Sequence, residues 1–414
     1  MADMRIIIVG GGIAGLAVAL RGSSRDIVVL EASQMNKEVG ALISLQPNAS
    51  KIATKLGLDK YLGGKGPTRD KAFRIYNTDG ELQAEIPSTE RFGADRLVYH
   101  RADLHDALKQ AATAIDGLGR PVRIIPSSRV MSCDSESGLV MLENGEHYSG
   151  DVIVGADGIH STMRTIITGP DVSSPKPTGI SAYRLLLDMK DVEKSRAFTS
   201  IINPREPFTT MVVGYDKRVI MGPGNNASLY GIVALIPDEH MHEASRSDSW
   251  TSNGSMKKLL ESFAAFPEWI LEVFKASGSS PALYQLRDID PLESWVHGRM
   301  ILIGDAAHAM LPTQGQGASQ SFEDAEALRE FLNDIPTPHT QAQIRKSLHD
   351  VFEARHERAS LIQAYSRQQA RPGTDMNRKR VTLNPAEFQE YNCAYEGARV
   401  WQAQQSSLKP IHTT

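Results

Sequence analysis

The chain has 414 residues, with 45 Lys and Arg against 49 Asp and Glu, and a formal net charge of −4. This balance excludes a strongly basic protein, and no run of Lys or Arg suggests nucleic-acid binding. Hydrophobic residues make up 41% of the chain and charged residues 23%, which is typical of globular proteins and excludes global disorder.

Cysteine and hydropathy patterns exclude further classes of protein. Cys133 and Cys393 cannot form a disulfide scaffold, and their spacing is not that of a zinc site. His240 and His242 have no obvious third ligand, so we expect no metal. Neither a membrane-spanning run nor a secretory signal is present, so we expect a cytoplasmic protein without stable membrane insertion.

The first predicted elements form a βαβ unit with glycines at its first turn. A buried strand is predicted over residues 6–9, followed by Gly10-Gly11-Gly12-Ile13-Ala14-Gly15 and a short helix over residues 16–20. A second strand is predicted over residues 26–31. In Gly10-x-Gly12-x-x-Gly15, the first glycine permits a tight turn, the second admits a pyrophosphate, and the third allows close helix packing.

Glu31 ends the second predicted strand, at the spacing where a carboxylate accepts hydrogen bonds from ribose hydroxyls. An acid at this position disfavours a 2′-phosphate, and therefore NADP, at this particular site. The pattern predicts a dinucleotide site, but it does not choose between FAD and NAD.

Helices and buried strands alternate in the rest of the chain. Helices are predicted over residues 47–56 and 101–115, and short strands over residues 122–142, with a hairpin turn at 143–146. A buried strand is predicted over residues 152–154, a mostly antiparallel sheet over 178–236, another buried strand over 300–303, and helices over 317–333 and 339–366. This order predicts an α/β protein: a Rossmann-like domain with a parallel sheet, an inserted, mostly antiparallel sheet domain, and C-terminal helices.

Two later segments resemble the motifs of one family. Residues 151–164, which contain Gly155-Ala156-Asp157-Gly158, resemble the DG motif of flavoprotein aromatic hydroxylases. Residues 299–317, which contain Gly304-Asp305 and end in Gly315-Gln316-Gly317, resemble their GD motif. With the N-terminal glycines, these motifs occur in the family's order. The chain resembles the single-component (group A) FAD-dependent monooxygenases, in particular the salicylate-hydroxylase-like enzymes of the fungal secondary-metabolism type.

The resemblance implies that the dinucleotide is FAD. It implies that Asp305 accepts hydrogen bonds from the ribityl chain and that the backbone of residues 315–317 lies close to the isoalloxazine ring. It also places the carbonyl of Pro312 near the site of the flavin–oxygen adduct. The helix that begins near Gly317 would point its positive end at the pyrimidine side of the ring, where reduced flavin is negative. The implied cofactor-binding residues are Gly10, Gly12, Ile13, Ala14, Gly15, Glu31, Ala32, Arg101, Val130, Asp157, Asp305, Pro312, Gly315, Gln316, Gly317 and Ala318.

Several implied roles have structural alternatives. Arg101 resembles a family arginine that reaches FAD from a helix start, and Asp157 would contact FAD or the reduced nicotinamide, with Arg164 holding the motif together. A purely structural ion pair of Asp157 and Arg164, and a packed His308 without chemistry, remain open. Since only one GxGxxG is present, NAD(P)H would bind transiently as the reductant, without a domain of its own.

The resemblance also implies a division of the chain. We expect residues 1–72, 97–177 and 285–370 to form the FAD-binding domain, residues 73–96 and 178–284 the substrate-binding domain, and residues 371–414 a C-terminal segment. One departure concerns the first helix, which is about two residues shorter than is usual in the family, with Gly22-Ser23-Ser24 where it normally continues.

Candidate catalytic residues lie in the predicted antiparallel sheet. Arg184 stands where related enzymes carry a strand residue facing flavin and substrate, and its guanidinium would stabilise a phenolate or carboxylate, or steady the peroxide. The alternative is a surface arginine on a sheet edge. Tyr215 and Tyr230 would donate hydrogen bonds to a bound oxygen, or else pack half-buried. Together with Arg184 and Tyr215, Pro312 completes the expected catalytic set.

The implied activity is that of an enzyme, an FAD-dependent, NAD(P)H-consuming monooxygenase. It would insert one oxygen atom from O2 into an aromatic, indole-like or other electron-rich small molecule through a flavin C4a-hydroperoxide. An epoxidase of an indole or prenyl alkene in natural-product biosynthesis is the nearest alternative. A flavin dehydrogenase and a non-enzymatic carrier of the same fold are more distant, and the absence of a WxWxIP segment disfavours a halogenase.

Overall fold

The computed structural model describes residues 4–19, 25–35, 41–88, 90–115, 119–169, 174–242, 251–370 and 381–405. Its first layer is a six-stranded sheet in the order β19–β20–β12–β1–β2–β8, in which only the edge strand β19 is antiparallel to its neighbour. The strands are β1 (Arg5–Val9), β2 (Asp26–Leu30), β8 (Arg123–Ile125), β12 (Val152–Gly155), β19 (Val296–His297) and β20 (Met300–Leu302). Continuous apolar strands such as β1 are buried on both faces, as a covered parallel sheet requires. The predicted Rossmann-like sheet is confirmed.

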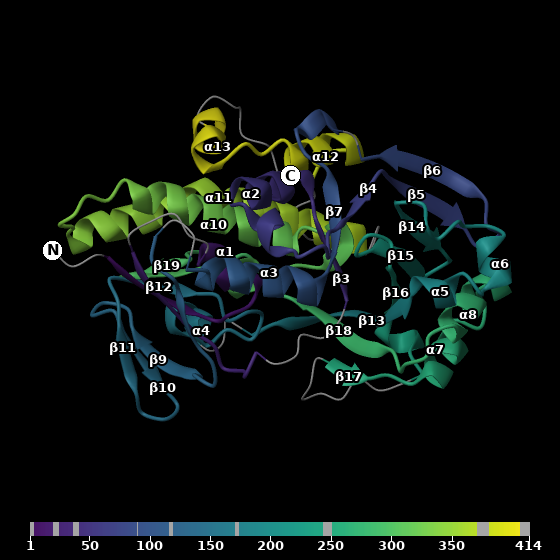
Figure 1. Ribbon diagram of the computed structural model, residues 1–414, viewed down its shortest axis with the longest axis horizontal. Coiled ribbons are helices and arrows are strands. Elements are labelled where there is room, and N and C mark those ends of the chain that lie inside the picture. The colour runs from purple at the N-terminus through teal and green to yellow at the C-terminus, as the bar shows by residue number, and fades with distance from the viewer. Residues whose placement is uncertain are drawn as a thin grey trace.

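The second layer is an eight-stranded sheet in the order β17–β18–β13–β16–β15–β14–β5–β6. All neighbours in it are antiparallel except β5 and β14. The strands are β5 (Ala72–Asn77), β6 (Leu82–Pro87), β13 (Lys176–Asp188), β14 (Phe208–Val213), β15 (Arg218–Gly224), β16 (Leu229–Pro237), β17 (Thr251–Asn253) and β18 (Ala282–Asp288). The predicted antiparallel insertion is therefore confirmed, and Figure 1 shows it to the right of the parallel sheet. The residue boundaries between the two domains stay a prediction.

The eight-stranded sheet has two unlike faces, because successive side chains of a strand point to opposite sides. Tyr183, Leu185 and Leu187 of β13 belong to a buried core with α7 (Met256–Ser262) and α8 (Glu268–Lys275), and we call this the helix-covered face. Ala182 packs instead with Leu311, from the loop after α9 (Asp305–His308). The face that carries Ala182 and Arg184 is therefore turned toward the first layer, and we call it the inner face.

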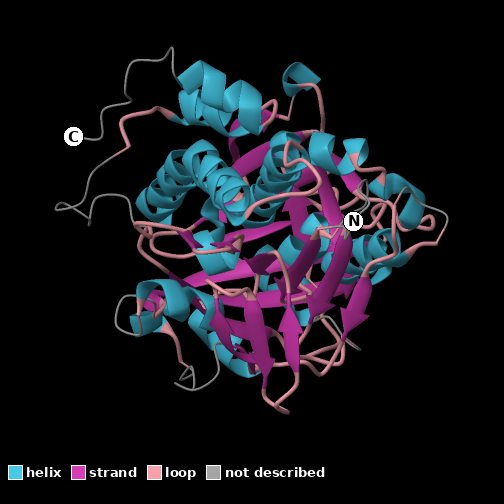
Figure 2. Ribbon diagram, turned by 90° about the vertical axis from the view of Figure 1, so that its left-hand side faces the viewer, coloured by secondary structure: helices cyan, strands magenta, loops and turns pink. Residues whose placement is uncertain are grey.

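Helices and two small sheets surround the main layers (Figures 1 and 2). One small sheet has the order β3–β7–β4 and the other β11–β10–β9. The hairpin predicted at residues 143–146 is confirmed by the antiparallel pairing of β10 with β11. The strands are β3 (Leu42–Leu45), β4 (Thr68–Asp70), β7 (Arg96–His100), β9 (Val130–Asp134), β10 (Leu139–Leu142) and β11 (His147–Ser149).

The predicted helices are confirmed, although the first one begins at Ile13, inside the glycine motif and three residues before its predicted start. They are α1 (Ile13–Val18), α2 (Pro47–Lys55), α3 (Arg101–Thr113), α10 (Gly317–Asn333) and α11 (Gln341–Ala370). Gly22-Ser23-Ser24 lies outside the described residues. The remaining helices are α4 (Thr162–Thr168), α5 (Met189–Val192), α6 (Arg196–Thr199), α12 (Pro385–Cys393) and α13 (Ala398–Gln405), with short 3-10 turns at Leu58–Tyr61, Glu90–Phe92, Asp238–His240 and Pro312–Gln314.

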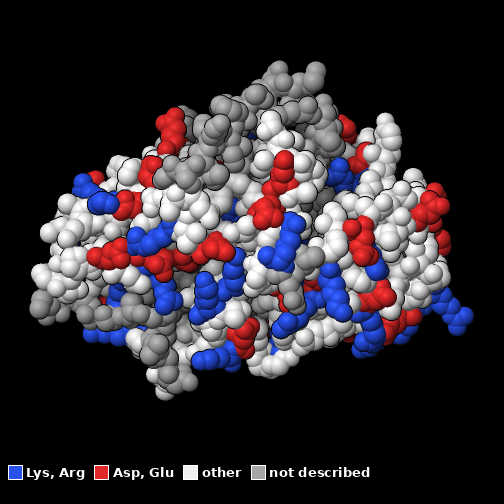
Figure 3. Space-filling view, turned by 90° about the horizontal axis from the view of Figure 1, so that it is seen from above, with Lys and Arg blue, Asp and Glu red and all other residues white. Residues whose placement is uncertain are grey.

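Figure 1 shows α12 and α13 beside α10 and α11, and α13 contacts both of these helices. On the face seen in Figure 3, positive and negative side chains are interspersed rather than gathered by sign. In the part of the chain that the structure describes, every helix is too short or too polar to span a bilayer.

Candidate active site

The glycine turn after β1 leaves open space at one glycine only. A Cβ at Gly10, where φ is +105°, would lie 2.4 Å from the carbonyl oxygen of Ala156, and a Cβ at Gly15 would lie 2.0 Å from that of Gly10. A Cβ at Gly12 would meet nothing within 4 Å. A side chain at Gly10 or Gly15 would therefore clash with the backbone of the turn. Gly12 leaves its backbone open to a ligand, as expected for a pyrophosphate site.

Two side chains hold this turn in place. Glu31 accepts hydrogen bonds from the backbone N–H of Gly11 at 2.7 Å and of Ser33 at 2.7 Å, one at each carboxylate oxygen. The Nε2 atom of His105, on α3, hydrogen-bonds the carbonyl oxygen of Gly11 at 2.8 Å, and burial lowers the pKa of this imidazole. The sequence prediction missed His105, although its place one turn after Arg101 on the same helix is a usable signal.

Arg164 joins the DG segment to the GD segment. Its guanidinium donates to the backbone oxygens of Asp305 at 3.3 Å and Ala306 at 3.0 Å. Asp157 accepts from the hydroxyl of Ser161 at 2.5 Å and from the N–H of Met163 at 3.1 Å, at the start of α4. Arg164 thus ties two motifs that are far apart in the sequence, and a contact of Asp157 with FAD stays a prediction.

Asp305 lies in a recessed position that solvent still reaches. It is the one exposed residue in the otherwise buried stretch 301–309. Even so, the surrounding protein raises the pKa of its carboxyl by desolvation, against the lowering effect of His308, Arg101 and Arg164. An accessible carboxylate with nearby cations is suited to accept hydrogen bonds from the hydroxyl groups of a ligand.

Arg101, the first residue of α3, is electrostatically coupled both to Asp305 and to Arg184 on the inner face of the eight-stranded sheet. The guanidinium of Arg184 lies 4.6 Å from the ring centre of Tyr284, and its Nε has no hydrogen-bond partner within the described residues. Burial lowers the pKa of Arg101, and the Arg184 charge lowers it further, whereas Tyr284 and Asp305 raise it. These couplings bring α3, β13, β18 and α9 together at one site.

The segment that begins at Pro312 lines the same region. Pro312 is exposed, Gly315 adopts φ of +60°, and a Cβ at Gly315 would lie 3.0 Å from the hydroxyl of Ser44. The side-chain oxygen of the buried Gln316 accepts from Asn48 at 3.2 Å and from Gln320 at 3.0 Å. Because Gln316 turns its side chain into the protein, the segment offers backbone rather than side chains to a ligand.

The structure does not support a catalytic Tyr215. This side chain is fully exposed, with a relative accessibility of 106%, in the turn between β14 and β15. A hydrogen bond donated in such a position would compete with bulk water, so the prediction is corrected. Tyr230 is 1% exposed, belongs to the core of the helix-covered face and stacks edge-on with Phe198, so it faces away from Arg184.

The other predicted residues lie as follows. Val130 is buried in the core around the parallel sheet, so a contact with FAD would have to come from its backbone. Ala32 is exposed after β2, Ile13 is buried, and Ala14 and Ala318 are half-buried. His240 pairs with Asp216, and among the described residues no group of three His, Cys, Asp or Glu is placed to hold a metal ion.

These residues fit FAD. The open backbone at Gly12 suits the pyrophosphate, the recessed Asp305 suits a polyol chain, and the backbone of residues 315–317 suits a flat ring system. Arg101, whose charge acts on Asp305, supplies positive charge nearby. The three motifs that the sequence analysis singled out therefore meet in one site, together with Arg101 and Arg184.

Comparison with known proteins agrees with this geometry. The family model described as FAD binding domain matches residues 3–363. An FAD-dependent monooxygenase from a Nectria species is 30% identical over 367 residues, which cover 87% of this chain and 83% of that protein. A salicylate hydroxylase from Pseudomonas putida is 31% identical over 380 residues, covering 88% and 84%. A solved complex of salicylate hydroxylase with substrate has a TM-score of 0.73 and 27% identity, and covers 98% of this chain and 94% of that one.

The chain belongs to this FAD-binding-domain family, in its salicylate-hydroxylase-like group. It is an FAD-dependent monooxygenase that uses NAD(P)H as co-substrate, and not a non-enzymatic carrier of the same fold.

Proposed function

We propose that the enzyme hydroxylates a small aromatic compound that carries a phenolate or a carboxylate, and that Arg184 binds this anionic group. The observation that carries the proposal is the position of Arg184, whose Nε lies buried without a hydrogen-bond partner in the described part of the chain. A buried donor of this kind is costly unless a ligand satisfies it. A planar, permanently charged guanidinium suits a carboxylate or phenolate oxygen.

The surroundings of Arg184 on the inner face are apolar. Leu186, Val233 and Ile220 lie on the same face of the sheet and are only half-buried, although their side chains are hydrophobic. Partly exposed apolar side chains beside one charged group are typical of a pocket that binds an aromatic ring and orients it with few polar contacts. The relatives named salicylate hydroxylase support the same class of substrate.

FAD, once bound and reduced by NAD(P)H, supplies the oxygen chemistry by delivering one atom of O2 to the substrate. The chain's own residues bind and orient the substrate. Arg184 would stabilise the electron-rich anionic form of the substrate, Tyr284 would hold the guanidinium from its other side, and the apolar inner face would exclude water. No observation favours an indole-like substrate or epoxidation over hydroxylation, and a cytoplasmic location remains a prediction.

The test is a panel of aromatic acids, phenols, indoles and prenylated compounds, assayed for stimulated NAD(P)H oxidation under isotope-labelled O2. We expect anionic aromatics to stimulate oxidation most, and their products to gain one labelled atom. If only neutral indoles or alkenes are converted, the proposed substrate class is wrong. Turnover without O2, with an artificial acceptor and no oxygen gained, would contradict hydroxylation itself.

A further inference from the structure

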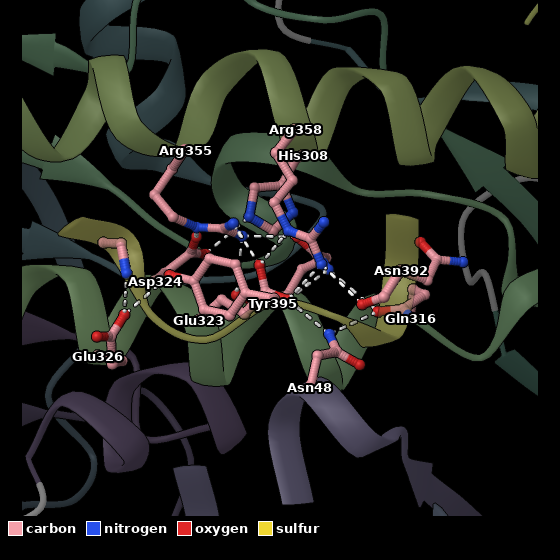
Figure 4. A network of polar contacts seen from close by, with 12 residues as sticks. Asn48, His308, Gln316, Glu323, Asp324, Glu326, Arg355, Arg358, Asn392 and Tyr395 are labelled. Carbon is pink, nitrogen blue, oxygen red and sulfur yellow. Dashed lines mark hydrogen bonds and ion pairs between the residues drawn. The ribbon is translucent and has the colours of Figure 1, made fainter. Parts of the chain in front are cut away.

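Four charged side chains lie fully buried between α10 and α11. Glu323 and Asp324 come from α10, and Arg355 and Arg358 from α11, and the exposure of each side chain is at most 1%. Arg355 pairs with both carboxylates, and Arg358 donates to Glu323 at 2.7 Å and 2.8 Å (Figure 4). We call these four residues the buried charge cluster.

The charges of the cluster balance within the protein. Burial alone would raise the pKa of Asp324, but the charges of His308 and Arg355 and the hydrogen bonds from His308 and Gly304 lower it to about 2. The pKa of Glu323 is likewise lowered by Arg358 and Arg355, although burial acts against them. Both carboxylates are therefore ionised at neutral pH. A buried arrangement of this kind is costly to assemble, and it is weak evidence for a role in stability alone.

Asp324 connects the cluster to the turn that carries Asp305. One of its oxygens accepts from the backbone N–H of Gly304 at 2.9 Å and interacts with Nε2 of His308 at 2.7 Å. Its other oxygen accepts from Nε of Arg355 at 3.0 Å. Gly304, with φ of +57°, directly precedes α9, and His308 is the last residue of that helix. Asp324 thus holds both ends of the four-residue helix on which Asp305 stands.

Glu323 connects the cluster to the segment around Gln316. It accepts from the side-chain amide of Asn48 at 2.5 Å, and the same amide nitrogen lies 3.2 Å from the side-chain oxygen of Gln316. Adjacent carboxylates on α10 therefore support the two segments, residues 304–308 and 315–317, that the site geometry assigns to the ribityl chain and the ring of FAD.

The cluster also reaches the C-terminal segment. Arg358 donates to the backbone oxygens of Tyr391 at 2.6 Å and Asn392 at 2.8 Å. Glu326, one turn after the two carboxylates, accepts from the hydroxyl of Tyr395 at 2.8 Å and from the N–H of Ala398 at 3.0 Å. These contacts lie beyond residue 363, where the match to the family model ends. Arg358 of the cluster therefore holds α12, and Glu326 beside the cluster holds the start of α13, although both helices lie outside the matched family domain.

We propose that the buried charge cluster is a positioning device for FAD, in which Asp324 and Glu323 hold the Asp305 turn and the 315–317 segment, and that the C-terminal segment completes it. The proposal concerns the affinity for FAD and does not depend on the substrate proposed above. An ordinary structural ion pair would affect folding alone. The proposed role requires in addition that the affinity for FAD change when the cluster is altered in a protein that is still folded.

The main test is the Asp324→Asn variant, with Glu272→Gln as the matched control. An amide has one acceptor oxygen, so Asn at position 324 cannot keep the hydrogen bonds with Gly304, His308 and Arg355 at the same time. Glu272 also accepts from backbone N–H groups, of Ala197 at 2.7 Å and Phe198 at 3.4 Å, but it lies on α8, on the helix-covered face. Both changes remove the charge of a carboxylate that orders a short helix. Only Asp324 contacts the segment that carries Asp305.

Dissociation constants for oxidised FAD are measured by fluorescence titration of the stripped full chain, at a temperature where all variants are folded by circular dichroism. The visible spectrum of bound flavin is recorded at saturation. We expect Asp324→Asn to weaken FAD binding by about tenfold, the scale of one lost hydrogen bond to a charged group, and to alter the flavin spectrum. Glu272→Gln should leave both unchanged. An affinity within about twofold of the original chain, with an unchanged spectrum, overturns the proposal.

If Asp324→Asn does not fold, Arg358→Lys tests the C-terminal part of the proposal in its place. Lysine keeps the positive charge but cannot form the paired contacts to Glu323 and to the backbone oxygens of Tyr391 and Asn392 at once. We expect a smaller loss of FAD affinity, of about threefold to fivefold, in a folded protein. A folded Arg358→Lys variant with unaltered affinity and spectrum would show that the C-terminal segment does not act on the cofactor site.

Discussion

Arg184 and the pair Arg355 and Arg358 differ in how the protein satisfies their guanidinium nitrogens. Arg355 and Arg358, between α10 and α11, are surrounded by carboxylates and backbone oxygens of the chain itself. Arg184, on the inner face of the eight-stranded sheet, has a buried Nε without a hydrogen-bond partner in the described residues, although aromatic rings lie beside all three guanidinium groups. Burial alone therefore does not indicate function. Arg355 and Arg358 are satisfied by the chain itself and support the segments around the cofactor site, whereas the Nε of Arg184 is available to a ligand.

The largest expected effect comes from a substitution in the paired arginines, Arg355 and Arg358. Arg355→Ala leaves Glu323 and Asp324 buried with one guanidinium fewer, and an uncompensated buried charge costs about 3–5 kcal/mol. We expect a loss of this order in the free energy of unfolding, measured by urea denaturation of the FAD-free chain. A loss below about 1 kcal/mol would mean that water or neighbouring groups replace Arg355. The ion pairs of Arg355 would then contribute little to stability.

The next effect concerns Asp305, on the short helix that Asp324 holds. Asp305→Ala removes an accessible side chain and leaves the buried packing of residues 301–309 in place, so we expect a folded protein with FAD affinity lowered by about tenfold or more. Flavin content after purification and titration with FAD measure this. Wild-type flavin occupancy would remove Asp305 from the cofactor site.

The smallest effect on the fold comes from Arg184→Ala, because no carboxylate loses its partner. We expect unchanged stability and FAD affinity, and a fall of about tenfold in product formed per NAD(P)H consumed, since a hydrogen bond between charged groups contributes about 1.5–3 kcal/mol. Arg184→Lys is the matched variant that keeps the charge and should restore part of the coupling. Coupled turnover at the wild-type rate in Arg184→Ala would make this arginine a packing residue.

Local patterns in the sequence were sufficient for the individual motifs. The roles of Gly10, Gly12 and Gly15 followed from their spacing, because a tight turn and close helix packing are constraints within a few residues. The position of Arg184 on a strand was also readable from the apolar run around it. The prediction for Tyr215 failed because alternation along a strand does not show where the strand ends, and Tyr215 lies in the turn just beyond β14.

The buried charge cluster escaped prediction for a different reason. Glu323, Asp324, Arg355 and Arg358 are ordinary helix residues by sequence, and charged residues on a helix are usually solvated. Their burial depends on how α10 packs against α11 and the C-terminal segment, which no local pattern records. His105 differs, because its place one turn after Arg101 is a sequence signal, although its contact with Gly11 joins two elements far apart in the chain.

The amino-acid sequence by itself determined the strand and helix order, the glycine turn and the three motifs that identify a flavin-dependent monooxygenase, because each depends on neighbours along the chain. Only the tertiary structure decided which charges are paired, which are left to a ligand, and that residues 385–405 contact the helix supporting the cofactor site. Those properties depend on side chains that are far apart in the sequence and in contact in the fold. The packing of the elements determines which of these groups are desolvated and which are hydrogen-bonded.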